Sequence, residues 1–400
     1  MSLKRVLAVT HEATLTGAPM NLLHLLRWMA ADGMDVHTLI VRDGPLRQYF
    51  EEVGPVTVLD RTSAGEMLGA VQQGLVHLGS RRAWRAVASA RLAPHRRRLR
   101  HFDLVYLNSA TSIGVLPFLG HDGPVVSHVH ELQVAIRGWR PESDRDQFLS
   151  RPDRWIAASD AVRTMLVDEL ELDSDRVLLH HEFIDTARIL GREVSAREVE
   201  RCRREYHIPE EASIVMGAGT VDWRKGPDLF VQLATEVRRR SRDPVHFVWV
   251  GGDLTGTDMQ RLRSDMDRSG ADHVHFVGVR PDPLPWFSMA DVFALTSRED
   301  PFPLVCLEHA VLGHPIVTYR NGGMVELLEP AGPEAARGIV DHLDVGSMAE
   351  RVLWFLNSDA DRLAAGAQLR ERVLNHHDVS VAAPALLDDL RSLVETRGRV

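Results

Sequence analysis

The sequence predicts an α/β protein with two doubly wound domains in tandem. Three observations support this: the chain has 400 residues, short apolar runs rich in β-branched residues recur along it, and helix-like patterns separate these runs. A chain of this length exceeds the size at which one hydrophobic core usually keeps growing. Strand-like runs that alternate with amphipathic helices are typical of parallel sheets built from βαβ units.

The strand-like runs form two series, which set the expected domain boundaries. The first series covers residues 5–10, 36–41, 56–59, 104–108, 125–130 and 155–159, and the second covers residues 213–219, 246–252, 273–278, 292–297, 315–319 and 338–340. We expect a first domain over residues 1–185 and a second over residues 186–378. A charged segment over residues 182–211 should hold a connecting helix, and a last helix over residues 379–400 should pack back toward the first domain.

The expected position of the functional site follows from this architecture. Ligands of open parallel sheets bind at the carboxyl ends of the strands. Two such domains that face each other would form a deep cleft, and we expect the site there.

Composition and charge exclude several classes of protein. No apolar run approaches the roughly 18 residues that a membrane span needs. The net charge of -9 argues against general nucleic-acid binding. Cys202 and Cys306 are too few for a disulfide framework and lack the spacing of a metal site. The N-terminus does not read as a signal peptide, so we expect a cytoplasmic protein.

Two acids stand eight positions apart in TSREDPFPLVCLEHAVLGHPIVT, residues 296–318. Asp300 lies in the loop after an expected strand. Glu308 lies about one turn into an expected helix and could accept two hydrogen bonds from a vicinal diol such as a ribose. On spacing alone, an ordinary helix cap and a solvated first-turn acid explain the two residues equally well.

The same helix could bind a ligand with its N-terminus. We expect it to start near Leu304, with Pro303 in its first position. The N–H groups of Leu304, Val305 and Cys306 would then be free for phosphate or sugar oxygens.

A second cluster lies in GAGTVDWRKGPDLFVQLA, residues 217–234, where Arg224 and Lys225 precede a helix expected to begin near Pro227. Only Lys4 and Lys225 are lysines among the 47 basic residues, which favours a need for a compact ammonium group at position 225. Two cations beside a helix start could neutralise a departing diphosphate. Ordinary surface charge is the alternative.

Two further candidates lie in the first domain. Gly17 precedes a helix expected to start near Ala18, and a glycine there lets a backbone N–H approach a phosphate or a sugar. No G-x-G-x-x-G follows this strand, which lowers the case for a nicotinamide cofactor. His128 and His130 lie two apart on a strand; we interpret His128 as structural, whereas His130 could bind a substrate hydroxyl. The sequence nominates no further metal ligands beside them.

Residues 81–100, RRAWRAVASARLAPHRRRLR, carry eight arginines and no acid. Such a segment is often a solvated surface. It could also contact an anionic membrane or a phosphorylated acceptor, which would make the protein peripheral to the membrane.

Taken with their spacing, these motifs resemble the retaining glycosyltransferases of family 4. That family has the GT-B architecture, in which two Rossmann-like domains face each other across a cleft. The resemblance is strongest over residues 217–326 and weaker over TGAPMNLLHLL and PVVSHVHE in the first domain. It covers most of the chain.

The resemblance implies roles for the second-domain residues. In the family's motif of two acids, Asp300 would bind the donor sugar and Glu308 the nucleotide ribose. Lys225, helped by Arg224, would stabilise the diphosphate, and the loop around Val279 would contact the base.

It also implies roles for backbone groups and for the first domain. The amides of Phe302, Leu304 and Val305 would contact sugar and diphosphate. Gly17 corresponds to the glycine of the family's first loop, and His130 to the histidine near the reacting sugar.

The chain departs from the family pattern at three positions. Asp300 stands where the family has Glu, although Glu299 precedes it. Pro303 replaces a glycine and removes one N–H donor. Thr220 replaces an arginine, for which Arg224 could substitute. These changes bear on the identity of the donor sugar more than on the fold.

The predicted function is retaining, metal-independent transfer of a sugar from a nucleoside-diphosphate sugar, UDP- or GDP-linked, to a hydroxyl acceptor, with no cofactor. A lipid-linked glycan, a cell-wall polymer and a small natural product remain open as acceptors. Two alternatives are a two-domain nucleotide-sugar epimerase and a non-catalytic module that binds sugar nucleotides.

Overall fold

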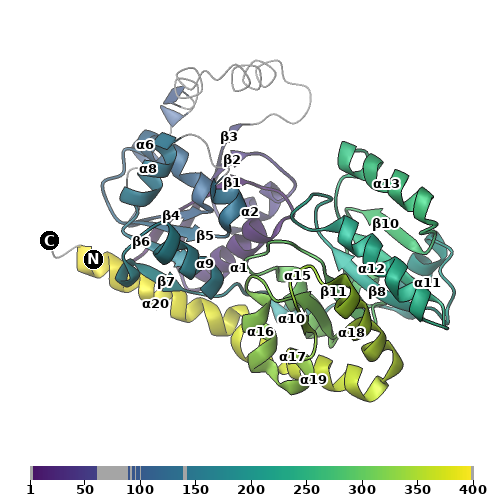
Figure 1. The fold of residues 1–400 in the computed structure, drawn as a ribbon. Coiled ribbons are helices and arrows are strands. Elements are labelled where there is room, and N and C mark those ends of the chain that lie inside the picture. The colour runs from purple at the N-terminus through teal and green to yellow at the C-terminus, as the bar shows by residue number, and fades with distance from the viewer. Residues whose placement is uncertain are drawn as a thin grey trace. The chain divides into compact units, whose positions relative to one another are not determined.

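The computed structural model describes residues 3–60, 89–90, 92–94, 96–99, 101–137 and 142–397. Contacts divide the chain into two compact units (Figure 1). Unit 1 comprises Met1–Phe183 and Val379–Val400, and unit 2 comprises Ile184–Asp378. The boundary expected from the sequence, at residues 185/186, lies close to this division.

Unit 1 is built on a seven-stranded parallel sheet with the order β3-β2-β1-β4-β5-β6-β7. Its strands are β1 Arg5–Glu12, β2 Asp35–Arg42, β3 Val56–Asp60, β4 Leu104–Asn108, β5 Val125–Val129, β6 Arg154–Ala157 and β7 Val177–Leu179. The sequence predicted the first six. It missed β7 because three residues are too short to show a strand pattern.

Helices cover both faces of the unit 1 sheet, as two separate hydrophobic clusters indicate. The last helix, α20 (Val379–Arg397), packs on α1 (Gly17–Ala31) in one of these clusters. The other described helices are α2 Arg47–Val53, α5 Arg96–Leu99, η1 Ala110–Val115, α6 Leu116–Leu119, α7 Gln133–Arg137, α8 Glu142–Ser150, α9 Asp160–Thr164, η2 Met165–Glu169 and η3 Ser174–Arg176.

Unit 2 has a six-stranded parallel sheet with the order β10-β9-β8-β11-β12-β13. Its strands are β8 Ser213–Ala218, β9 Val245–Val250, β10 Val274–Gly278, β11 Val292–Leu295, β12 Ile316–Tyr319 and β13 Ile339–Val340. In both sheets the strand order reverses beside the first strand of the unit. This is the doubly wound arrangement, which places a ligand site where the order reverses.

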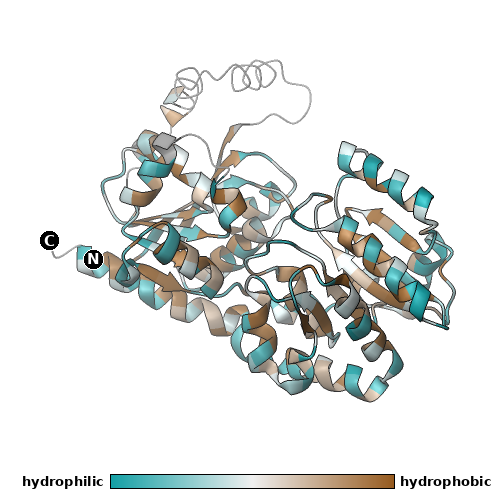
Figure 2. Ribbon diagram, viewed as in Figure 1, coloured by the Kyte–Doolittle hydropathy of each residue, from teal (hydrophilic) through white to brown (hydrophobic). Residues whose placement is uncertain are grey.

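The helices of unit 2 follow its strands along the chain. They are α10 Thr186–Leu190, α11 Ala196–Glu205, α12 Pro227–Arg240, α13 Thr257–Ser269, α14 Leu284–Phe287, α15 Leu304–Leu312, α16 Met324–Ala331, α17 Pro333–Ala336, α18 Val345–Asn357 and α19 Asp359–His376. The connecting segment expected over residues 182–211 holds two of them, α10 and α11. The strands are predominantly apolar, and the outer faces of the helices are polar (Figure 2).

Local sequence explains where the two most important helices of unit 2 begin. Gly226 adopts a left-handed conformation (φ 66°) that turns the chain into α12, and Pro227 occupies the first helical position. Pro303, in contrast, is the residue before α15 and has an extended conformation (φ -68°, ψ 120°). The expectation that Pro303 is the first helical residue was therefore wrong by one position.

Most of the arginine-rich segment lies outside the described residues, so its contact with an anionic membrane stays a prediction. Flotation of the protein with vesicles of anionic lipid would test it. Within the described residues, no helix combines the length and the apolar character needed to cross a membrane.

Candidate functional site

The loops that follow β8 and β11 are joined where the strand order of unit 2 reverses. The backbone N–H of Arg298 donates to the carbonyl of Arg224 at 2.8 Å. The Thr296 hydroxyl donates to the carbonyl of Gly226 at 2.9 Å. These bonds hold residues 219–226 against residues 296–303, at the place where doubly wound sheets bind their ligands.

Two glycines allow these loops to approach closely. A Cβ at Gly226 would lie 2.2 Å from the Thr296 carbonyl oxygen, and one at Gly322 would lie 1.9 Å from the Asp300 carbonyl oxygen. Gly322 also has a left-handed conformation (φ 58°). The N–H of the next residue, Gly323, donates to the carbonyl of Pro301 at 2.8 Å. The loop after β12 therefore supports the loop after β11.

An ion pair between Lys225 and Asp300 lies at the centre of this arrangement. The Lys225 Nζ donates to Asp300 Oδ2 at 2.6 Å, and the Ser297 hydroxyl donates to the same oxygen at 2.9 Å. The side chains are only 14% and 6% exposed. Burial alone would raise the pKa of Asp300, but the positive charges of Lys225 and then Arg224 outweigh it and lower that pKa. Asp300 is thus a buried carboxylate rather than a helix cap.

Arg224 adds a second cation beside this pair. Its Nη1 donates to the carbonyl of Glu299 at 3.2 Å and lies 3.7 Å from Asp300 Oδ1. The side chain is 37% exposed, so its other guanidinium donors can reach a ligand. Two cations and one carboxylate leave a formal charge of +1, which favours an anion.

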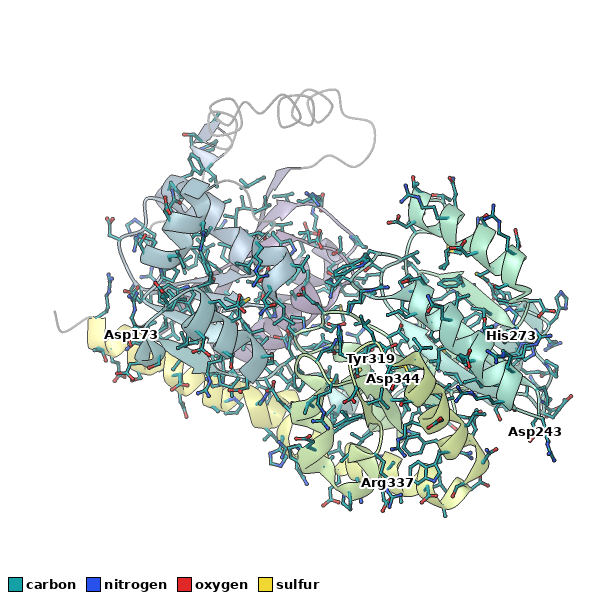
Figure 3. All side chains as sticks on the ribbon, in the orientation of Figure 1. Asp173, Asp243, His273, Tyr319, Arg337 and Asp344 are labelled. Carbon is teal, nitrogen blue, oxygen red and sulfur yellow. The ribbon has the colours of Figure 1, made fainter. Side chains whose placement is uncertain are left out.

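Arg298 braces the loop from the other side. Its guanidinium makes two hydrogen bonds to the Asp228 carboxylate, at 2.9 and 2.7 Å, and a third to the carbonyl of Trp223 at 2.8 Å. It also lies 5.3 Å from the centre of the Trp223 ring. Tyr319, at the end of β12 (Figure 3), is fully buried, and burial raises the pKa of its hydroxyl. Arg298 therefore ties the loop after β11 to the loop after β8 and to the start of α12.

Glu308 differs from Asp300 in having no stabilising charge beside it. It is half-buried in the second turn of α15, and burial raises the pKa of its carboxyl group to about 7. Within the described residues, no hydrogen bond or ion pair involves this carboxyl group. A desolvated acid without a partner is costly to the folded protein, and hydrogen bonds from a ligand would offset that cost. Glu308 is thus not a solvated surface acid.

The start of α15 supplies backbone donors. Pro303 precedes the helix and gives no side-chain cap. The N–H of Cys306 donates to the carbonyl of Pro303 at 3.0 Å, so the expectation that it is free was wrong. The N–H groups of Leu304 and Val305 are among those that a helix start leaves without an intrahelical acceptor. The Phe302 side chain is buried and stacks on His377, with 5.1 Å between ring centres.

Val279 follows β10, two strands away from β8 in the sheet. Its side chain is 60% exposed, and the preceding Gly278 has a left-handed conformation (φ 73°). Val279 therefore lies at the same carboxyl edge as the ion pair without being part of it.

The structure places the two candidates of unit 1 at the carboxyl edge of the seven-stranded sheet. Gly17 is exposed and is the first residue of α1. His130 directly follows β5, and both of its ring nitrogens are engaged: Nδ1 with Glu182 Oε1 at 2.5 Å and Nε2 with Asn108 Oδ1 at 2.9 Å. Asn108 also donates to the carbonyl of Ala18 at 3.0 Å, which links the two candidates. His128 is fully enclosed, as expected for a structural histidine.

Sequence reasoning missed several residues that build these sites. Asn108 ends a strand-like run, and a polar residue there was a signal that could have been used. Glu182 lies 52 positions from His130 and gave no local signal. Ser297 and Arg298 stand beside Asp300, but only the fold shows what they contact.

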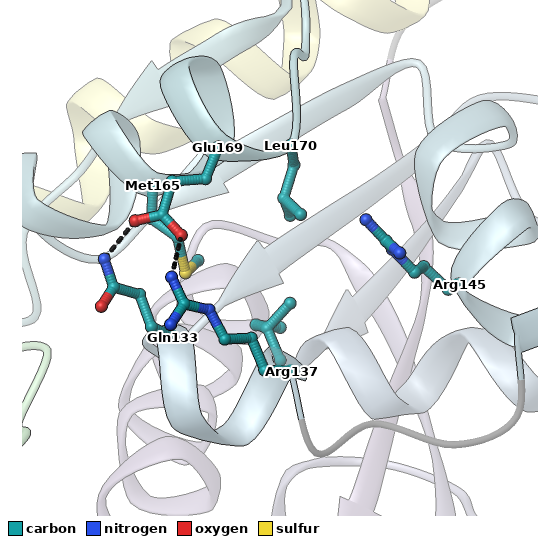
Figure 4. Close-up of a pocket in the computed structure, with 7 residues that line it drawn as sticks. Gln133, Arg137, Arg145, Met165, Glu169 and Leu170 are labelled. Atoms are coloured by element: carbon teal, nitrogen blue, oxygen red, sulfur yellow. Dashed lines mark hydrogen bonds and ion pairs between the residues drawn. The ribbon is translucent and has the colours of Figure 1, made fainter.

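One surface pocket of unit 1 lies apart from these clusters. A pocket of about 370 Å³ in unit 1 is lined by Gln133, Ile136, Arg137, Arg145, Met165, Glu169 and Leu170 (Figure 4). In it, Gln133 and Arg137 both donate to Glu169. None of the residues nominated from the sequence lines this pocket.

Comparison with family models gives matches in both units. The model of Glycosyltransferase Family 4 matches residues 16–188, and that of Glycosyl transferases group 1 matches residues 198–372. The chain belongs to glycosyltransferase family 4. Its fold is the GT-B fold of two Rossmann-like units, and it is a glycosyltransferase, as the sequence predicted.

Relatives and solved structures agree with this membership. This family 4 chain is 26% identical over 371 residues to the D-inositol 3-phosphate glycosyltransferase of Kineococcus radiotolerans, covering 86% of this chain and 80% of that protein. A relative with the same name from Salinispora tropica is 29% identical over 298 residues, covering 68% of this chain and 61% of that protein. For the second relative, the match spans less than two thirds of its length.

Two solved structures share the fold of this family 4 chain. Anabaena HepE in complex with UDP and glucose has a TM-score of 0.78 at 17% identity, over 98% of this chain and 99% of that chain. Sucrose-phosphate synthase from Thermosynechococcus elongatus has a TM-score of 0.76 at 16% identity, over 98% of this chain and all (100%) of that chain. None of these findings favours an epimerase or a non-catalytic module.

Proposed function

We propose that the protein transfers a sugar from a nucleoside-diphosphate sugar to a hydroxyl group of an acceptor, with retention of the anomeric configuration. One observation carries the proposal. In unit 2 a buried Lys225–Asp300 pair flanks the start of α15 together with a desolvated Glu308, whose carboxyl group has no partner among the residues that the structure describes. Few ligands need cations, helix N–H groups and a diol acceptor together, and a nucleotide sugar is one of them.

Each part of the donor has a matching group. The diphosphate is bound by Lys225, Arg224 and the N–H groups at the start of α15, because cations and helix N-termini both favour phosphate oxygens. Glu308 accepts hydrogen bonds from the two ribose hydroxyls. Asp300, the shorter acid of the motif, faces the donor sugar. HepE, which shares the fold, has been solved with UDP-glucose, which supports a nucleotide sugar as the donor.

The reaction needs negative charge to be stabilised on the leaving group. The bond between the anomeric carbon and the diphosphate oxygen breaks, and Lys225 and Arg224 stabilise the departing nucleoside diphosphate. The acceptor oxygen forms its bond to the anomeric carbon on the same face, which retains the configuration. The proton of the acceptor hydroxyl passes to an oxygen of the departing diphosphate, so atoms and charge balance without a metal or a cofactor.

The first experiment is a thermal-shift screen of UDP, GDP and their common sugar conjugates, with Glu308→Gln as the matched variant. A ligand that binds the folded state raises the melting temperature. We expect at least one nucleotide to stabilise the wild-type protein and to stabilise Glu308→Gln less. Equal shifts for both proteins would contradict the assignment of Glu308 to the ribose.

The second experiment tests transfer and its stereochemistry. The donor found in the screen is incubated with candidate acceptors, including the phosphorylated inositol named for the relatives. NMR of the product then gives the anomeric configuration. Retention supports the proposal, inversion removes the retaining mechanism, and binding without transfer to any hydroxyl acceptor would favour a binding module.

A further inference from the structure

The hydrogen bonds of His130 in unit 1 bear on the protonation state of its ring as well as on its position. The ring nitrogens lie 2.5 Å from Glu182 Oε1 and 2.9 Å from Asn108 Oδ1. The His130 and Glu182 side chains are only 6% and 4% exposed. Water therefore competes little for these two hydrogen bonds.

The orientation of the Asn108 amide decides which atom faces the histidine. Its Nδ2 lies 3.0 Å from the carbonyl oxygen of Ala18, which can only accept a hydrogen bond. The amide nitrogen must therefore point to Ala18 and the amide oxygen to His130 Nε2, because the opposite orientation would place two acceptors together.

Both partners of the His130 ring are thus acceptors. The Asn108 oxygen requires a proton on Nε2, and the Glu182 carboxylate requires a proton on Nδ1. A neutral imidazole carries only one of these two protons.

We propose that Asn108 and Glu182 hold His130 as a doubly protonated imidazolium, so that the carboxyl edge of the unit 1 sheet carries a fixed positive charge and not a proton acceptor. Asn108 and Glu182 are then positioning residues. This inference rests on the proposed transferase function for its consequence but not for its geometry.

The charged groups around His130 agree with this assignment. Burial lowers the pKa of His130. The charge and hydrogen bond of Glu182, and then the charge of Glu131, outweigh burial and raise this pKa above its usual value. Glu131 also accepts a hydrogen bond from the His130 backbone N–H at 2.9 Å. The nearest other titratable ring, His128, has its centre 4.0 Å away.

His128 provides an internal contrast. Its Nδ1 lies 2.6 Å from the Tyr106 hydroxyl, and burial raises the pKa of that hydroxyl, which therefore stays protonated. Burial, and then the charges of His130 and His180, lower the pKa of His128. His128 is thus neutral, although its ring lies beside that of His130.

The charge of His130 limits its role in the reaction. A doubly protonated His130 cannot remove the proton of the acceptor hydroxyl, so that proton must leave by another route, such as the departing diphosphate. Activity that depends on the charged ring should fall as the pH rises through its raised pKa. If His130 instead acted as a base, activity would rise as the pH rises through its pKa.

The test is ¹⁵N NMR of histidine-labelled protein between pH 5 and pH 9, with the His130 signals assigned by their loss in His130→Gln. We expect both ring nitrogens of His130 to carry protons at pH 7. In Glu182→Gln the pKa of the ring should fall by about 1 to 3 pH units, the effect of losing a close opposite charge. The wild-type titration alone tests the inference if this variant does not fold.

Asp389→Asn is the matched control, because Asp389 contacts another histidine of unit 1, His180, at 2.7 Å. It should leave the His130 signals unchanged. A bare ring nitrogen on His130 at pH 7, or signals unaffected by Glu182→Gln, would overturn the inference. Neither measurement needs a donor, so this result is independent of whether transfer is observed.

Discussion

The polar groups at the carboxyl edges of the two sheets differ in whether they have hydrogen-bond partners. In unit 1, His130, Asn108 and Glu182 satisfy one another through buried hydrogen bonds. In unit 2, Lys225 and Asp300 form a comparable pair, but Glu308 and the first N–H groups of α15 lack such partners within the described residues. Unit 1 therefore has a closed network at this edge, and unit 2 has an open one.

This difference indicates how the two edges contribute to function. A closed network keeps its shape and charge without a ligand, so it suits a group that must already be in position. An open network leaves desolvated groups whose cost a ligand offsets, so it suits the binding of a donor. We therefore expect nucleotide affinity to depend on unit 2.

The largest expected effect comes from Lys225→Ala. Removing the lysine leaves Asp300 buried without its main partner, and breaking a buried pair costs about 3 to 5 kcal/mol of the free energy of unfolding. The lost charge should also reduce transfer by about 10² to 10³-fold. Urea unfolding gives the first quantity, and kcat/KM with the donor from the thermal-shift screen gives the second.

Two further variants separate these effects. Lys4→Ala removes the other lysine of the chain, which is exposed in unit 1, and should change neither quantity. Adding Asp300→Asn to Lys225→Ala should restore part of the stability, because it removes the uncompensated charge, but none of the activity. If stability were not regained, the pair would not be the buried unit that its geometry indicates.

A comparison of two glycines tests whether the close approach of the loops after β8 and β11 contributes to stability and nucleotide binding. Gly226 and Gly270 have the same left-handed conformation (φ 66°), but only Gly226 would place a Cβ against another backbone, that of Thr296. Gly270→Ala should cost only the left-handed strain of about 1 to 2 kcal/mol. Gly226→Ala adds overpacking of about 1 to 3 kcal/mol and should also weaken nucleotide binding.

Calorimetry of both variants, in unfolding and in nucleotide titration, makes this comparison. Equal losses of stability, or unchanged nucleotide affinity in Gly226→Ala, would mean that the contact with Thr296 does not position the site.

Glu308→Gln should weaken nucleotide binding by about 10 to 100-fold, since hydrogen bonds to a charged group contribute about 1.5 to 3 kcal/mol. The wild-type protein should also bind more weakly as the pH falls below 7, because burial raises the pKa of Glu308 to about 7 and a proton then competes with the ribose hydroxyls. Titration calorimetry at pH 6, 7 and 8 measures both effects. The variant should lack this pH dependence, and a wild-type affinity that is constant over this range would contradict the role of Glu308.

The same residue predicts a stability effect of defined sign. The folded pKa of Glu308 is raised from 4.5 to about 7, so the folded state holds this proton more tightly than the unfolded state. The stability that this proton contributes is complete below pH 4.5 and is lost as the pH rises through about 7. Without ligand, Glu308→Gln should thus be more stable than the wild-type protein at pH 8 and similar to it at pH 4. Thermal unfolding at both pH values measures the difference.

How much the sequence could predict depended on the range of the interactions. Among the thirteen strands that the structure describes, twelve showed a local apolar pattern, and only β7 was too short to do so. The repeat of strand and helix therefore predicted both sheets. Helix starts were predicted to within about a residue, but Pro303 showed that the same residue can precede a helix or begin it.

The site was predicted only in part. Lys225 stood out because lysine is rare in this chain, and Asp300 and Glu308 because of their spacing. Sequence could not tell that Asp300 would be neutralised by a lysine 75 residues away, whereas Glu308 would have no partner in the described part of the chain. The partners of His130 were hidden for the same reason, since Glu182 lies in a different segment of unit 1.

The smallest expected effect is that of Val279→Ser, which tests whether the nucleotide-binding edge of unit 2 extends as far as Val279. Val279 is 60% exposed and does not take part in the network around Asp300, so its replacement should leave the stability of the protein unchanged. If the base of the nucleotide packs on this side chain, the lost apolar contact is below about 1 kcal/mol, or roughly fivefold in affinity. Leu363→Ser, at an exposed position of α19, is the matched control and should leave affinity unchanged. Titration of the nucleotide and of its ribose diphosphate fragment then decides the matter, because only the ligand with a base should distinguish Val279→Ser from the wild-type protein.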